Sequence, residues 1–137
     1  YRQSRKRGQR LSDQSPLEHY HSYRIGVKKL RYAMEFFQPE LEDQCFLQLL
    51  RSLKTSQDAF GLFHDRMIQL DFISRCTGTL QEGEAHPGQL EAVEQLVDQI
   101  QQKARDRKAD SLQQARWLIS DVTARSFQQC FQYPVGK

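Results

Sequence analysis

Residues 21–37, HSYRIGVKKLRYAMEFF, constrain the fold most, because their spacing describes one helix with two chemically different faces. At 100° per residue, four cationic or imidazole residues recur at steps of three, four and three and cover about 80° of the helix. We call them the basic stripe: His21, Arg24, Lys28 and Arg31. The opposite side is apolar: Tyr23, Gly26, Val27, Leu30, Ala33, Met34 and Phe37. An apolar face of this width predicts a helix that packs on a core.

The charges of the basic stripe favour a negatively charged ligand. Arg24 and Lys28 are like charges at i and i+4, which repel each other on a helix, and Lys29 adds to the same field. The alternative is a solvated face whose cations pair with Glu35 and Asp58, and surface ion pairs of this kind contribute little to stability.

The distribution of charge along the chain also points to an anionic partner. The 137 residues have a net charge of +3, but residues 1–31 hold nine Lys or Arg against Asp13 and Glu18, a net charge of +7. The remainder holds eleven basic and fifteen acidic residues, a net charge of −4. An anion should therefore meet the N-terminal third. The segment RQSRKRGQR alone reads equally well as a solvated basic tail.

Length and composition indicate one domain outside the membrane. The chain is long enough for one core, and no apolar run approaches the length of a membrane span or of a signal-peptide core. It begins with Tyr rather than Met, so we expect it to start inside a longer protein. Cys45, Cys76 and Cys130 are far apart in the sequence, which favours reduced thiols and a cytoplasmic location over a disulfide framework.

The remaining pattern predicts helices joined by short loops. Ser15, Pro16 and Glu18 form a capping-box signal at the start of the first main helix, which Pro39 should stop near residue 38. A second helix is expected over residues 41–60, ended by Gly61, and a third over residues 64–76. The glycine-rich segment 77–88 is the clearest predicted loop.

From about residue 89 the apolar positions keep helical spacing as far as Val122. The polar segment 103–111 permits either one helix or two, and one long helix is preferred because no Gly or Pro interrupts it. No β-hairpin signal is present. The predicted fold class is all-α, an antiparallel four-helix bundle with a long C-terminal helix.

Two sequence blocks resemble the CHAD family, the conserved-histidine α-helical domain. The first is H-x-x-R-I-x-x-K-K-L-R-Y-x-x-E-F-F at residues 21–37, and the second is L-K-x-x-Q-D-A-F-G-x-x-H-D at residues 53–65. The resemblance implies a domain of two four-helix halves that binds inorganic polyphosphate, with this chain similar to the second half. Residues 1–14 would then be a basic N-terminal segment at the end of a preceding helix, and residues 15–137 the bundle.

The resemblance also implies a set of binding residues. The basic stripe and Lys29 match the basic helix of the family, Lys54 matches a basic position on the next helix, and Tyr32 matches an aromatic position. Arg51 and Lys54 are expected to form the opposite wall, if the two helices pack together. Further contacts are expected from the N-terminal segment: Arg5, Lys6, Arg7 and Arg10. The chain departs from the family pattern at Gly26, Phe60 and His64.

A second apolar flank lies beyond the basic stripe, formed by Ile25, Tyr32 and Phe36. Residues of this kind are usually core. A helix with two apolar sides must pack on both, so we expect this flank to meet the missing half or a second copy of the chain.

No catalytic motif is present, so the prediction is a protein that is not an enzyme and needs no cofactor or metal. His19 and His21 cannot chelate one ion, because residues two apart on a helix point about 200° apart. Cations crowded around His21 fit binding of phosphate better than a phosphohistidine relay, and His64 and His86 are expected in exposed turns. The leading hypothesis is therefore a polyphosphate-binding module; the alternatives are RNA or single-stranded DNA binding, or a protein-interaction bundle.

Overall fold

The computed structural model describes residues 1–38, 43–83 and 86–131, and these residues form five helices and no strand. In chain order the helices are α1 (Arg2–Gln9), α2 (Leu17–Phe37), α3 (Gln44–Glu82), α4 (Pro87–Ile119) and α5 (Asp121–Phe131). The predicted all-α fold class is confirmed. None of these helices combines the length and the apolarity that a membrane span requires.

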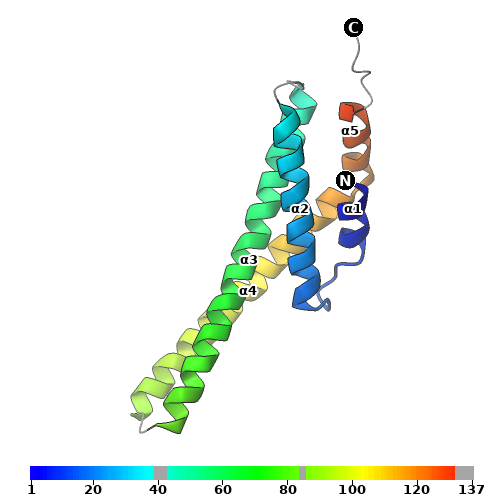
Figure 1. The fold of residues 1–137 in the computed structure, drawn as a ribbon. Helices are drawn as coiled ribbons and strands as arrows, with labels where there is room; N and C mark the ends of the chain where they lie inside the picture. Colours follow the sequence, from blue (N-terminus) through cyan, green and yellow to red (C-terminus); the bar gives the residue numbers. More distant parts are fainter. Residues whose placement is uncertain (39–42, 84–85, 132–137) are drawn as a thin grey trace.

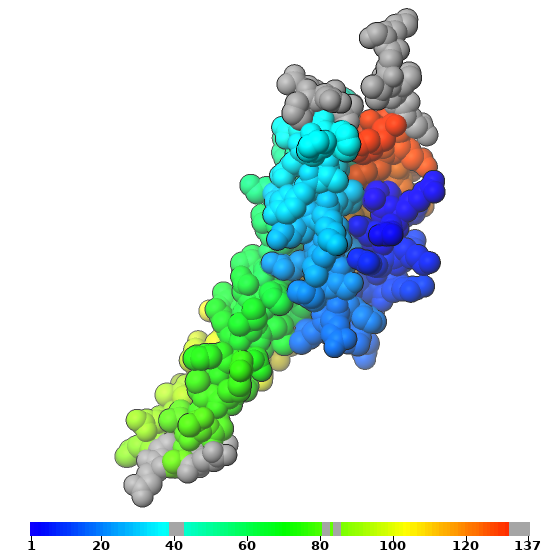
Figure 2. All heavy atoms as spheres, in the orientation of Figure 1, coloured from blue at the N-terminus to red at the C-terminus, as the bar shows by residue number. Residues whose placement is uncertain are grey.

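The two longest helices, α3 and α4, form an antiparallel pair (Figure 1). Helix α2 packs along one half of α3, whereas α1 packs on α2 and α4, and α5 packs on α3 and α4. The far ends of α3 and α4 extend beyond α2 as a two-helix arm (Figures 1 and 2). Phe72 and Leu96 are exposed there, because nothing in the described chain covers the arm.

The core lies where α2, α3, α4 and α5 meet. Aromatic rings join α2 to α3, since the ring centroids of Tyr23 and Phe60 are 4.9 Å apart and those of Tyr20 and Phe63 are 5.1 Å apart. The main buried residues are Tyr20, Tyr23, Val27, Met34, Phe46, Leu49, Leu53, Phe60, Phe63, Leu112, Ala115, Leu118 and Phe127. They recur at helical spacing on each helix, which is why these segments are helical and pack together.

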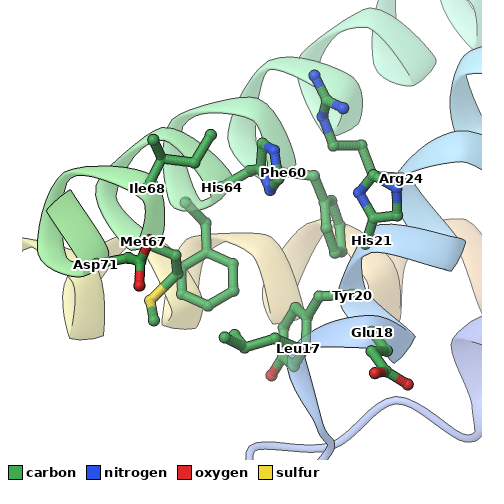
Figure 3. A pocket seen from close by; sticks show the side chains of 11 residues that line it. Leu17, Glu18, Tyr20, His21, Arg24, Phe60, His64, Met67, Ile68 and Asp71 are labelled. Carbon is green, nitrogen blue, oxygen red and sulfur yellow. The ribbon is translucent and has the colours of Figure 1, made fainter.

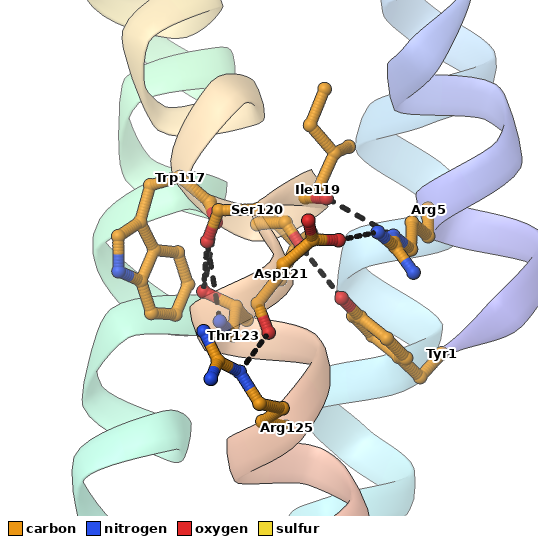
Figure 4. Close-up of polar contacts among 9 residues, drawn as sticks. Tyr1, Arg5, Trp117, Ile119, Ser120, Asp121, Thr123 and Arg125 are labelled. Atoms are coloured by element: carbon orange, nitrogen blue, oxygen red, sulfur yellow. Dashed lines mark hydrogen bonds and ion pairs between the residues drawn. The ribbon is translucent and has the colours of Figure 1, made fainter.

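The N-terminal residues contact the chain where α4 ends and α5 begins (Figure 4). The last carbonyls of a helix lack intrahelical partners. Here the Tyr1 hydroxyl donates to the Leu118 carbonyl at 2.9 Å, and Arg5 Nε donates to the Ile119 carbonyl at 3.0 Å. The basic N-terminal segment is therefore a folded part of the domain, and Arg5 stabilises the end of α4.

The predicted break at Gly61 is wrong, because α3 continues through it to Glu82. Gly61 does not adopt positive φ, and the buried side chains of Phe60 and Phe63 hold this turn on the core. Burial of two aromatic side chains outweighs the roughly 1 kcal/mol by which Gly is less favourable than Ala in a helix. The prediction of a loop over residues 77–88 is also largely wrong: α3 continues to Glu82 and α4 begins at Pro87, because the two helices pack against each other.

Two predicted helix ends also differ from the structure. Helix α2 begins after Pro16 without a side-chain cap, because the Ser15 hydroxyl instead accepts a hydrogen bond from the Ser12 amide at 2.9 Å. The long C-terminal helix is interrupted, at Ser120 rather than within residues 103–111. The Ser120 hydroxyl accepts from the Thr123 amide at 3.2 Å and so caps α5. The stop expected at Pro39 lies outside the described residues.

The predicted apolar face of α2 is rotated in the structure. Tyr23, Val27 and Met34 are buried as expected, and Tyr20 joins them, but Ala33 and Phe37 are exposed. Within the described residues the second flank lies largely outside the core, since Tyr32 is 47% exposed and Phe36 is 79% exposed; that this flank meets the missing half or a second copy of the chain stays a prediction. The core of this chain covers only one side of α2.

Candidate functional site

The basic stripe lies beside the line where α2 meets α3. The imidazole rings of His21 on α2 and His64 on α3 lie 5.5 Å apart between centroids. Because the two helices are antiparallel and each rises 1.5 Å per residue, ten residues along α2 from His21 reach Arg31, and ten residues back along α3 reach Lys54. The stripe therefore runs along the line of contact between α2 and α3, which we call the seam. It extends from the level of His64 to the level of Lys54 on α3.

Arg24 and Arg31 are only partly exposed, in contrast to the fully solvated arginines of a tail. The Nε atom of each is buried and has no hydrogen-bond partner among the described residues. A buried donor without a partner costs free energy, so an oxygen-rich ligand would gain by supplying one. Arginine can bind phosphate oxygens through two parallel hydrogen bonds, which suits these positions to a phosphate ligand.

Tyr32 lies beside two cations of the stripe. The Lys28 ammonium lies 5.6 Å from the centre of its ring, and the Arg31 guanidinium lies 4.7 Å from it. These cation–π contacts hold both cations near the outer edge of the seam. Arg31 also forms an ion pair with Glu35 at 3.1 Å, whereas Arg24 and Lys28 form no ion pair within the described parts of the chain.

A groove of about 360 Å³ opens at the His21 end of the stripe, between α2 and α3 (Figure 3). Its apolar walls are Leu17, Tyr20, Phe60, Phe63, Met67 and Ile68. Its polar lining comes from His21, Arg24 and His64, together with Glu18 and Asp71. Asp71 is already paired with Arg75, so its charge is compensated. The groove thus places two imidazoles and one guanidinium at its edge.

Two of the predicted site residues, Lys29 and Arg51, point away from the seam, and a third, Lys54, lies at its rim. Lys29 is exposed and lies about 140° around α2 from Arg24, on the other side of the stripe. Arg51 is exposed and lies about 140° around α3 from His64, so it does not form the expected wall with Lys54. Lys54 is exposed and about 80° from the direction of His64, at the rim of the seam.

The N-terminal cations form a separate surface. Arg5 is engaged with the Ile119 carbonyl and with Asp121 at 2.6 Å. Arg7 and Arg10 line a pocket of about 160 Å³ with His19 and Ser22. Ser22 lies about 160° around α2 from Arg24, so this pocket faces away from the basic stripe. Lys6 is exposed on α1.

His64 is the site residue that sequence reasoning missed. The expected helix break at Gly61 assigned His64 to a turn. If α3 is read as continuous, His64 follows the core residue Phe60 by four positions, which places it on the same face of the helix. That spacing is the signal that could have identified it.

Burial raises the pKa of two tyrosines of α2, Tyr20 and Tyr23. Desolvation raises the pKa of Tyr20 to about 12, and it raises the pKa of Tyr23 further. The Tyr20 hydroxyl donates to the Ser12 carbonyl at 2.9 Å. A tyrosine is neutral near pH 7 even at its ordinary pKa of about 10, so these phenols add no negative charge beside the stripe, and burial extends this to higher pH.

Comparison with known proteins supports one family. The model of the CHAD domain matches residues 1–74, which span α1, α2 and most of α3 and include the basic stripe and His64. Neither a search of curated proteins nor one of solved structures finds a match. Because the family model covers more than half of the 137 residues, this chain belongs to the CHAD domain family.

Proposed function

We propose that this chain binds inorganic polyphosphate along the basic stripe and that it does so without catalysing a reaction. The observation that carries the proposal is Arg24. Its Nε is buried without a partner, it pairs with no carboxylate of the described chain, and it lines the groove together with His21 and His64. A cation held in this way is suited to an anion from outside the chain.

The arrangement of the stripe suits a linear polyanion. His21, Arg24, Lys28 and Arg31 extend over ten residues of α2, which is about 15 Å along the helix axis. A flexible chain of phosphates presents oxygens at every repeat and no sequence to read, so it needs a row of cations rather than one closed pocket. The arginines bind oxygens in pairs, and Lys28 acts as a point charge.

The test is a titration with fluorescently labelled long-chain polyphosphate at two salt concentrations. Neutralising phosphates releases counterions, so affinity should fall steeply with salt. The triple variant Arg24→Ala, Lys28→Ala, Arg31→Ala should reduce affinity at low salt by at least about tenfold. It should also reduce the steepness of a plot of log affinity against log salt concentration. Each of the three lost cations should lower the slope by roughly 0.7, about two in total.

A matched control removes the same charge from α4, in the variant Lys103→Ala, Arg105→Ala, Arg116→Ala. These residues are exposed and lie outside the groove. The control should change affinity by less than about threefold, since only the general field of the protein is altered. Far-UV circular dichroism checks that both variants fold. Equal losses in the two triple variants would contradict a site on the stripe.

RNA or single-stranded DNA remains a second candidate because Tyr32 is half-exposed beside Lys28 and Arg31. Bases stack on exposed aromatic side chains, and each such contact contributes about 1–3 kcal/mol. Polyphosphate has no base to stack. Tyr32→Ala should therefore weaken binding of a single-stranded oligonucleotide by about fivefold or more and leave polyphosphate binding nearly unchanged. Competition between the two ligands at equal charge shows which one the stripe prefers.

A further inference from the structure

The structure brings together two cysteines that the sequence separates by 85 positions. Cys45 lies in the first turn of α3 and Cys130 lies in the last turn of α5. The Cys130 thiol donates to Cys45 Sγ with the two sulfur atoms 2.9 Å apart. The covalent S–S bond of a disulfide is about 2.05 Å long, so little movement separates this contact from a bond.

The packing around the pair keeps the two helix ends in place. The Phe46 and Phe131 rings lie 6.2 Å apart between centroids, and they directly follow the two cysteines in the sequence. The Cys45 thiol donates to the Ser126 carbonyl of α5 at 3.9 Å. Asp43 caps α3, since its carboxylate accepts from the Cys45 amide at 3.4 Å. The two thiols are therefore held together by contacts that do not depend on a covalent bond.

We propose that Cys45 and Cys130 are a redox-responsive pair that forms a reversible disulfide and thereby ties α5 to the start of α3. The pair is on the opposite end of α3 from the two-helix arm, and neither cysteine lines the groove beside the basic stripe. The inference is thus independent of the proposed ligand. In reducing compartments, disulfides of this type are usually transient or redox-sensing.

The reaction balances with hydrogen peroxide as the oxidant. Cys45 is the more exposed of the two, so its sulfur, as thiolate, attacks one peroxide oxygen, the O–O bond breaks, and hydroxide leaves. The product is a sulfenic acid on Cys45. The Cys130 sulfur then attacks the Cys45 sulfur, the S–O bond breaks, and water leaves with the Cys130 proton. Overall, two thiols lose two electrons and two protons, and one peroxide becomes two waters.

Burial favours the disulfide over a metal ion held by the same sulfurs. Cys130 is 4% exposed, and burial together with the contact to Cys45 raises its pKa to about 12. A metal ion would need both sulfurs as thiolates, with Asp43 as the third nearby ligand group. A disulfide is neutral and carries no desolvation cost of a charge.

The experiment uses the Cys76→Ser background, because Cys76 is exposed and would form bonds between molecules. Purified protein is reduced, freed of reductant and treated with hydrogen peroxide, and then analysed by intact mass and peptide mapping. We expect the loss of two hydrogen masses, a peptide linking residues 45 and 130, and a midpoint of thermal unfolding higher by about 10 °C than that of the reduced form. Reductant should reverse all three changes.

Two variants make the result specific. Cys45→Ser and Cys130→Ser, each in the Cys76→Ser background, should lose the mass change and the shift of the thermal midpoint. Persistence of two free thiols in the folded parent after peroxide, or oxidation only to sulfinic acid, would overturn the proposal. The proposal would also be overturned if the parent, but not the variants, retained one zinc ion per chain after dialysis and this ion protected both thiols from peroxide.

Discussion

His21 of α2 and His64 of α3 stand opposite each other, with imidazole centroids 5.5 Å apart, at the point where the basic stripe meets the groove. The two rings come from successive helices and are 43 positions apart in the sequence, yet they border the same opening as Arg24. This contact shows which face of α3 lies beside the basic stripe, and therefore which residues of α3 are close enough to share a ligand with it.

The two histidines are expected to act on the same phosphate group. His21→Leu and His64→Leu should each lower polyphosphate affinity about threefold or more. The fold-loss of affinity in the double variant should be smaller than the product of the two single fold-losses. Groups that share a partner commonly show coupling of about 0.5–3 kcal/mol. Polarisation titrations of the four proteins measure this coupling. Strictly multiplicative losses would show that the rings act separately.

The ion pair between Arg31 and Glu35 should compete with the ligand. The Arg31 side chain is only 16% exposed and its guanidinium lies 3.1 Å from the Glu35 carboxylate. Glu35→Gln removes the competing charge, so polyphosphate should bind about two- to threefold more tightly at low salt, and the free energy of unfolding should change by less than about 0.5 kcal/mol. As a control, Glu94→Gln on α4 makes the same charge change away from the stripe. An equal gain in the control would point to net charge alone.

Gly8 and Gly61 should respond in opposite ways to the same substitution. A Cβ on Gly8 would lie 2.6 Å from Ile119 Cγ2 and 2.9 Å from the Tyr23 ring, whereas a Cβ on Gly61 would meet nothing within 4 Å. Gly8→Ala should therefore lower the free energy of unfolding by about 1–3 kcal/mol through overpacking. Gly61→Ala should raise it by up to about 1 kcal/mol, because Ala favours a continuous helix. Urea unfolding measures both. Destabilisation by Gly61→Ala would indicate that α3 is broken there.

Arg5 should matter for stability more than for the ligand. Its guanidinium donates to the Ile119 carbonyl and pairs with the exposed Asp121. Arg5→Gln should lower the free energy of unfolding by about 1 kcal/mol, mainly through the lost hydrogen bond at the end of α4. Polyphosphate affinity should change no more than it does in Arg10→Gln, which removes the same charge from an exposed position. If Arg5→Gln lowered polyphosphate affinity more than Arg10→Gln does, Arg5 would belong to the binding site after all.

Much of the candidate site was predictable because it lies on one helix. The positions of His21, Arg24, Lys28 and Arg31 follow from 3.6 residues per turn, and the structure keeps all four along one side of α2. The second wall was not predictable in the same way. The resemblance to the family indicates Lys54, and charge indicates Arg51, but neither signal gives the rotation of α3 about its axis. That rotation is set by the burial of Phe60 and Phe63, and it presents His64 beside His21.

The sequence by itself determined the all-α class, the helix of residues 17–37, the row of cations along it and the likeness to the CHAD family. These properties depend on local spacing, since each helical turn is formed by residues three or four positions apart. Only the tertiary structure decided that Gly61 is helical, that Arg5 serves the end of α4, that His64 meets His21 and that Cys45 meets Cys130. Each of these outcomes depends on how one helix packs against another, and local periodicity does not encode that pairing.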